Sequence, residues 1–291
     1  MTGELDGLRA WIGREETRRE VLAPAPLVRA AATLDRDDPP SADGDPIPPG
    51  WHWCNFVPAP PQSEIGDDGH PRLGGFLPPV PLPQRMWAGG RMTFARPLAV
   101  GEPATRRSEI VKVEPKSGRS GRLVFVTVRH TVSGAAGPAT IEEHDIVYRE
   151  QARPGAAAAP PARAPARADW SRTVAPDPVL LFRLSALTFN GHRIHYDRPY
   201  CETEAGYPGL VVHGPLTFIL LLDLVRRELP DATVAGVDYR MMRPLFDVHR
   251  FTVNGARAED GTLDLWAADH EAALATRAAV ALAEGDGRSQ K

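Results

Sequence analysis

The side chains best suited to proton transfer lie in one short segment of the chain. It reads Phe189-Asn-Gly-His-Arg-Ile-His195-Tyr-Asp197, and His213-Gly214-Pro215 begins eighteen residues after His195. Imidazole accepts and releases protons near neutral pH. A Gly-Pro pair before an apolar run is typical of a helix that begins at a ligand site, where free N–H groups favour negative charge. The pattern predicts proton transfer next to a carbonyl group.

Three of these positions are candidates for catalysis. His195 is the expected base that activates a water molecule, and the Asn190 amide can orient that water without exchanging protons. The N–H of Gly214 is the expected donor to an oxyanion, because Pro215 has none; such donors contribute roughly 3 kcal/mol. Structural roles stay open for each residue: a histidine satisfied by its neighbours, an asparagine that caps a turn, and a glycine that permits close helix packing.

The polar neighbours are candidates for substrate binding. His192 either shapes the site or is exposed, and His213 either supports the turn before the helix or takes part directly. Arg193 and Arg198 can bind a phosphate or a carboxylate, although exposed arginines are common. Asp197 can supply a carboxylate only if the backbone turns it to the same side as His195.

Composition narrows the class of protein. The 291 residues are 42% apolar with a formal net charge of −3, so a large core is expected and nucleic acid is not an expected partner. The longest apolar run, Leu216–Val225, is shorter than the roughly 20 residues of a membrane helix and contains polar residues. Two cysteines, Cys54 and Cys201, and a charged N-terminus predict a reduced, cytoplasmic protein. No spacing typical of a metal site is present, so no metal is expected.

The chain divides at an Ala/Pro/Arg-rich tract. Residues 151–168 are expected to be a linker between domains 1–150 and 169–291. The apolar segment 27–35 of the first half resembles 181–190 of the second, which suggests a duplication in which only the second copy keeps its histidines.

Apolar periodicity predicts the elements that position these residues. Residues 215–229 are apolar nearly all round, which favours a buried helix wrapped by other structure. Alternating β-branched and aromatic residues predict strands, and Glu259-Asp-Gly261 predicts a hairpin turn. The expected strands are 122–132, 141–148, 234–242, 250–253 and 263–267. One buried helix followed by antiparallel strands is the order of a hotdog fold.

Several of these motifs resemble a known family. Asn190-x-x-x-x-His195 and the segment 206–214 are similar to the signature of MaoC-like, (R)-specific enoyl-thioester hydratases. Residues 75–90 resemble the N-terminal half of type 2 hydroxyacyl-thioester dehydratases, most of all the mesaconyl-CoA and itaconyl-CoA hydratases. The resemblance implies an α+β double hotdog, without a cofactor, in which an aspartate and a histidine five residues later act on water. Asn190 stands at the aspartate position, and Asp197 is the expected replacement.

The resemblance implies a function with open alternatives. It indicates a hydro-lyase that acts on a short, branched or dicarboxylic enoyl-CoA, with Arg193 and Arg198 binding coenzyme A phosphate or a second carboxylate. A dehydratase of acyl-carrier-protein thioesters, a non-catalytic acyl-thioester-binding protein and a thioesterase use the same fold. A homodimer is also expected by analogy, since hotdog sheets often extend across a partner.

Overall fold

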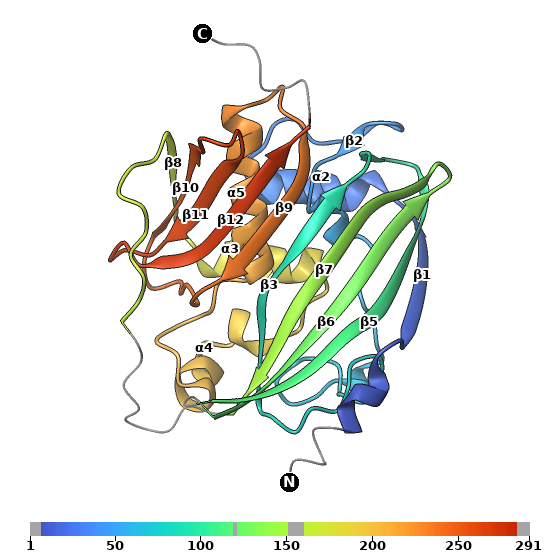
Figure 1. The fold of residues 1–291 in the computed structure, drawn as a ribbon, viewed down its shortest axis with the longest axis vertical. Coiled ribbons are helices and arrows are strands. Elements are labelled where there is room, and N and C mark those ends of the chain that lie inside the picture. The colour runs from blue at the N-terminus through green and yellow to red at the C-terminus, as the bar shows by residue number, and fades with distance from the viewer. Residues whose placement is uncertain (1–6, 119–120, 151–159, 284–291) are drawn as a thin grey trace.

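One antiparallel sheet of ten strands dominates the computed structural model, which describes residues 7–118, 121–150 and 160–283 (Figure 1). The strands follow the order β1-β5-β6-β7-β3-β9-β12-β11-β10-β8. In chain order, their bounds are β1 Glu15–Val21, β3 Gln84–Phe94, β5 Pro103–Gly118, β6 Gly121–Gly134, β7 Gly137–Arg149, β8 Trp170–Val174, β9 Val234–Met241, β10 Phe251–Arg257, β11 Leu263–Ala268 and β12 Leu274–Leu282. A separate pair joins β2 Pro46–Ile47 to β4 Leu98–Ala99.

The sheet is built from two halves of matching topology. Read from its two outer edges inward, β1, β5, β6, β7 and β3 correspond to β8, β10, β11, β12 and β9. The halves meet where β3 pairs with β9, from Gly89 opposite Arg240 to Thr93 opposite Gly236. A Cβ on Gly89 would lie 2.4 Å from the carbonyl oxygen of Tyr239, so this junction requires glycine. The matching order supports the expected duplication.

The helices show where the two halves differ. In the second half, α3 (Pro178–Leu187) is followed by α5 (Gly214–Glu228), whose residues from Leu216 to Val225 are all buried. In the first half, α2 (Pro24–Thr33) corresponds to α3, but the place of α5 is taken by the short 3-10 helix η2 (Trp51–Cys54). Among the described residues, the first half therefore has no long helix in the place of α5.

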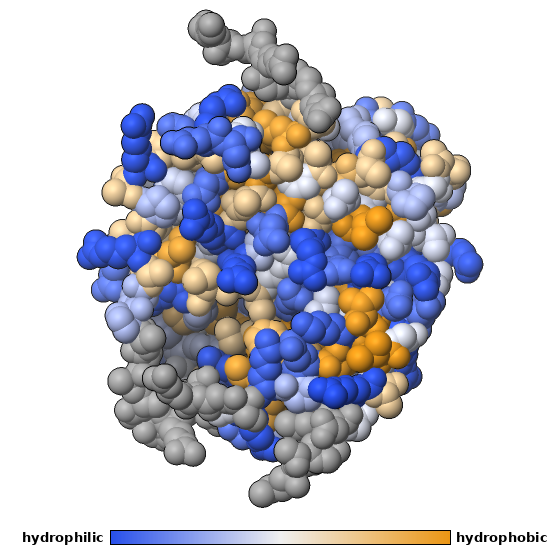
Figure 2. Space-filling model, viewed as in Figure 1, coloured by the Kyte–Doolittle hydropathy of each residue, from blue (hydrophilic) through white to orange (hydrophobic). Residues whose placement is uncertain are grey.

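The remaining expectations about elements agree with the structure within a few residues. The buried helix and the five expected strands correspond to α5 and to β6, β7, β9, β10 and β11. Of the expected linker 151–168, residues 151–159 lie outside the described part, and the following residues pair with the loop after β11, where Arg163 bridges Ala273. Within the described ranges, none of the helices has the length and apolar character needed to cross a membrane. The face in Figure 2 is covered mainly by hydrophilic side chains, with scattered apolar patches.

Candidate active site

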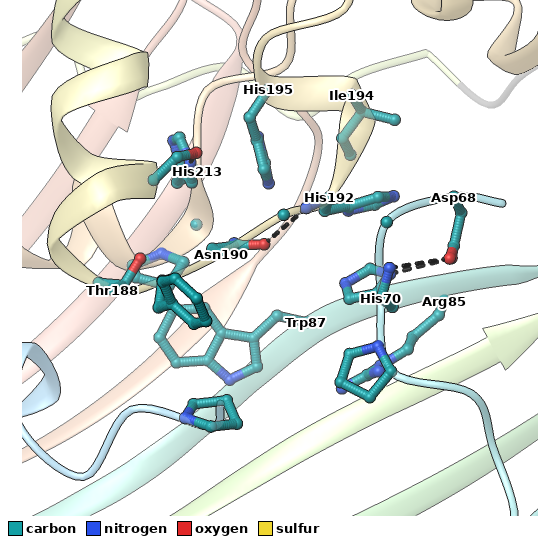
Figure 3. A pocket seen from close by; sticks show the side chains of 18 of the residues that line it. Asp68, His70, Arg85, Trp87, Thr188, Asn190, His192, Ile194, His195 and His213 are labelled. Carbon is teal, nitrogen blue, oxygen red and sulfur yellow. Dashed lines mark hydrogen bonds and ion pairs between the residues drawn. The ribbon is translucent and has the colours of Figure 1, made fainter. Parts of the chain in front are cut away.

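A cavity of about 1680 Å³ lies between the halves and receives side chains from both. The second half contributes the loop after α3 and the N-terminal end of α5, and the first half contributes β3 and the loop before it. Figure 3 shows His195, His192 and His70 around this cavity, with Trp87 on its far wall.

His195 lies at the end of the 3-10 turn η4 (Arg193–His195) and is 7% exposed. Its Nδ1–H donates to the carbonyl oxygen of Val211 at 2.7 Å, which leaves Nε2 as a proton acceptor. Burial lowers the pKa of His195 to about 3, although the Val211 carbonyl acts in the opposite direction. The imidazole is therefore neutral at physiological pH, the form that a proton acceptor requires.

The ring of His213 stacks on the ring of His195. The two ring centroids lie 3.6 Å apart, and the ring planes are inclined by 16°. His213 Nε2 lies 2.8 Å from the hydroxyl oxygen of Ser185 in α3, and burial keeps the pKa of His213 well below its usual value. His213 is also the N-cap residue of α5. The ring thus connects α3, the start of α5 and the loop that carries His195.

Gly214 opens α5 next to the indole of Trp87. An added Cβ would lie 2.9 Å from Trp87 Cε3, so a side chain at position 214 would displace the indole. The first N–H groups of an α-helix have no carbonyl partner within the helix. Gly214 lines the cavity, so α5 begins at the cavity wall, with the end of a helix that favours negative charge.

Asn190 and His192 both line the cavity, and one hydrogen bond joins them. Asn190 Oδ1 accepts from the backbone N–H of His192 at 3.0 Å, which closes a turn and leaves the amide NH₂ as a donor (Figure 3). Burial lowers the pKa of His192 to about 3, and its ring lies edge-on to His195 with centroids 5.4 Å apart. The oxygen of Asn190 therefore caps a turn, which is the structural role expected as an alternative.

Three of the expected substrate-binding residues are engaged elsewhere. Arg193 and Asp197 form an ion pair at 2.8 Å, and Asp197 Oδ1 caps the short helix α4 (Arg198–Tyr200) by accepting from the N–H of Tyr200. Arg198 forms an ion pair with Asp247. None of the three lines the cavity among the residues described, so the structure gives no support to Asp197 as the replacement carboxylate or to the arginines as ligands of the acyl group, and their binding of a coenzyme A phosphate outside the cavity stays a prediction.

The sequence interpretation missed a histidine that the first half supplies. His70 and Asp68 lie on the loop between η3 (Gln62–Glu64) and β3, and both line the cavity. Asp68 Oδ2 lies 3.0 Å from His70 Nδ1, and the His70 ring contacts His192 with centroids 3.9 Å apart. Arg85 and Trp87 of β3 complete this wall (Figure 3). Gly66-Asp-Asp-Gly-His-Pro71, a turn that carries charged side chains, was the available signal.

Two sets of donor atoms have spacings that a metal ion could bridge. They belong to Asp68, His70 and His192, and to His130, Glu142 and His144, with the atoms of each set within 4.8 Å of one another. In the first set, both oxygens of Asp68 already accept hydrogen bonds from His70, from its backbone N–H and its ring. In the second, Glu142 accepts a hydrogen bond from Trp53 and lies 3.2 Å from His52 Nε2. Both carboxylates are thus satisfied within the protein, which does not favour a metal centre.

Comparison with known proteins agrees with this geometry. The family model described as hydroxyacyl-thioester dehydratase type 2 matches residues 50–247. The chain is 48% identical over 274 residues to the mesaconyl-C(4)-CoA hydratase of Chloroflexus aurantiacus, covering 94% of this chain and 97% of that protein.

Two solved structures from Mycobacterium tuberculosis share the fold. HtdX is 19% identical with a TM-score of 0.63, covering 92% of this chain and 99% of its own. A second protein, described as a double hotdog, is 16% identical with a TM-score of 0.56, covering 95% and 97%. The α+β double hotdog expected from the sequence is therefore confirmed. Because its family model spans more than half of the chain and a relative of 48% identity spans nearly all of it, the chain belongs to the hydroxyacyl-thioester dehydratase type 2 family.

Proposed function

We propose that this protein catalyses the reversible addition of water to a short 2-enoyl-CoA thioester, which gives the 3-hydroxyacyl-CoA. The observation that carries the proposal is the position of His195. A neutral imidazole with a free Nε2 lies in the same cavity as the N-terminal end of α5. Hydration of an enoyl thioester needs these two features together, a group that engages water and donors that stabilise the enolate.

The roles of the second-half residues follow from their positions. His195 Nε2 accepts a hydrogen bond from the water that attacks the β-carbon, and the Asn190 NH₂ group orients the same water. The N–H of Gly214 donates to the thioester oxygen as negative charge develops, which contributes roughly 3 kcal/mol in comparable sites. His192 shapes the wall beside the water, and His213 holds the ring of His195 through their stacking.

We further propose that the acyl group is dicarboxylic, of the mesaconyl type. The 48% identity to a mesaconyl-C(4)-CoA hydratase supports this substrate. Arg85 lines the cavity beside His70 and supplies a cation for a second carboxylate (Figure 3). Arg85 replaces Arg193 and Arg198 in this role.

A direct assay tests the proposed reaction. Loss of the enoyl-thioester absorbance is followed with crotonyl-CoA, mesaconyl-CoA and itaconyl-CoA, and products are identified by mass. We expect hydration by the wild type and at least a roughly 100-fold loss of kcat in His195→Ala. The matched control is His249→Ala, an exposed histidine that stacks on His270 outside the cavity, with wild-type activity expected. Release of free thiol would instead indicate a thioesterase, and binding without turnover a non-catalytic protein.

We propose a cytoplasmic location and a homodimeric assembly. Cys54 and Cys201 are free and buried, which supports a reducing, cytoplasmic environment. Strands β1 and β8 end the sheet, so each leaves one edge for pairing with a second copy. We propose a homodimer on this basis.

A further inference from the structure

We propose that Asp68 and His70, from the first half, form the second acid–base group of the hydration site. His70 would carry the proton between water and the α-carbon, and Asp68 would position His70 and stabilise its protonated form. The inference rests on the proposed function. It assigns a catalytic role to a half of the molecule that keeps no counterpart of the His195 motif.

The need for such a group arises from the second half itself. Addition of water requires a base that carries the proton of the water to the α-carbon, a role that suits a histidine backed by a carboxylate. Asn190 stands where a carboxylate is expected and cannot take up a proton, and its oxygen is engaged by the N–H of His192. Asp197 is held by Arg193 outside the cavity. The catalytic loop therefore presents imidazoles to the cavity without a carboxylate of its own to back them.

The loop of the first half that precedes β3 supplies a histidine paired with a carboxylate. Both oxygens of Asp68 face His70: Oδ1 accepts from its backbone N–H at 2.9 Å, and Oδ2 pairs with its Nδ1 at 3.0 Å (Figure 3). A carboxylate at Nδ1 fixes the tautomer, so Nε2 carries the free lone pair. It also stabilises the imidazolium that forms when Nε2 takes a proton. His195 has a neutral carbonyl in the equivalent position, so His70 is the better proton carrier.

This loop is held by hydrogen bonds and close backbone contact against the segment that contains Gly191 and Arg193. Residues 64–72 form a small hairpin, in which Ile65 bridges Pro71 and the N–H of Gly66 donates to the carbonyl of His70. The N–H of Arg193 donates to the carbonyl of Asp68 at 2.9 Å.

Gly69, at the tip of this hairpin, has a φ of +87°, and a Cβ there would lie 1.8 Å from the carbonyl oxygen of Gly191. The backbone contact between the halves thus requires glycine. It holds His70 against the ring of His192.

The oxygen of the water bonds to the β-carbon while one O–H bond breaks and its proton passes to His70 Nε2. The π electrons of the double bond move toward the thioester oxygen, where the N–H of Gly214 stabilises the enolate. The proton then passes from His70 to the α-carbon, and the thioester carbonyl re-forms. His195 accepts a hydrogen bond from the hydrogen that remains in the new hydroxyl group, so both histidines end neutral.

The test compares variants of His70 and Asp68 in the full-length protein with mesaconyl-CoA and crotonyl-CoA. We expect His70→Gln to lower kcat by roughly 100- to 10,000-fold, the usual range for a general acid–base group, with KM changed by less than about threefold. Asp68→Asn should lower kcat strongly as well, because it permits the wrong tautomer. Added imidazole should restore part of the activity of His70→Ala, which a purely structural role would not allow. The control is His249→Gln, with unchanged kcat and melting temperature.

Each outcome decides between the two proposals. Wild-type kcat in both His70→Gln and Asp68→Asn, with His195→Ala inactive, overturns the role of His70 and leaves the proposed function standing. A loss of kcat that matches a loss of folded protein in a melt, without imidazole rescue of His70→Ala, also overturns it. Activity abolished by EDTA and restored by zinc would assign these side chains to a metal ion instead. A wild type that hydrates none of the thioesters refutes the proposed function and this inference together.

Discussion

At the scale of single residues, the environment of His195 sets its chemistry. Burial keeps the ring neutral, the Val211 carbonyl fixes its tautomer, and the stacked His213 holds its orientation. Motif spacing predicted His195, Asn190 and Gly214 as site residues, because they lie on segments whose local pattern is distinctive, and all three line the same cavity. It did not identify His70, whose position depends on a backbone contact between Gly69 and Gly191 across the two halves. It also did not show that Arg193 and Arg198 pair with Asp197 and Asp247, because Asp247 becomes a neighbour only in the fold and the Arg193–Asp197 pair depends on the local turn.

Asn190→Asp tests the residue-scale account. The new carboxylate can still accept the hydrogen bond from the N–H of His192, so the turn should persist. We expect kcat to stay within about tenfold of wild type, because a carboxylate can also hold the water. A negative charge near His195 favours the imidazolium, so the pKa of His195 should rise and the acid limb of the kcat/KM profile should move to higher pH. A pH–rate series on both proteins checks this; an acid limb that stays in place or moves lower would contradict it.

At the scale of elements, the start of α5 places His213 and Gly214 next to His195 of η4. The long apolar run predicted this helix well, because a helix surrounded by structure needs apolar residues on every side. The same argument could not foresee that the first half replaces it with the short turn η2. Phe218 of α5 packs against Trp53 of η2, with ring centroids 5.1 Å apart, so α5 also covers part of the first half.

Gly214→Ala tests the junction of α5 with β3. The added methyl group would meet Trp87 Cε3, and overpacking of this kind costs roughly 1–3 kcal/mol of stability. We expect a lower melting temperature together with lower kcat, since alanine keeps the N–H but moves the indole. Trp87→Phe removes the contacting ring atoms, so the double variant should recover stability relative to Gly214→Ala. Thermal melts and kinetics of the three variants check this, and additive losses in the double variant would rule the contact out as the cause.

At the scale of the whole molecule, both halves contribute side chains to one cavity. The second half supplies His195, Asn190 and the helix end, and the first half supplies Trp87, Arg85 and the hairpin that carries His70. The sequence predicted two similar halves and the double hotdog, because strand periodicity and the family motifs are local signals. It could not predict the pairing of β3 with β9 or the shared cavity, which depend on long-range register.

The cavity also reaches a second polar group in the first half. Arg106, His130 and His144 line it, and the buried Glu142 lies beside them. The cavity thus contains two polar regions, one around His195 and one around Glu142. The position of the bound thioester in this cavity decides whether the reaction takes place beside His195.

A crystal structure with bound butyryl-CoA, a saturated thioester that cannot be hydrated, tests this most directly. The predicted result places the thioester oxygen about 3 Å from the N–H of Gly214, with the α- and β-carbons between His195 and the hairpin of His70. A thioester bound instead beside His130 and Arg106, with the ring of His195 out of reach of the acyl carbons, would contradict the placement of the reaction between His195 and His70.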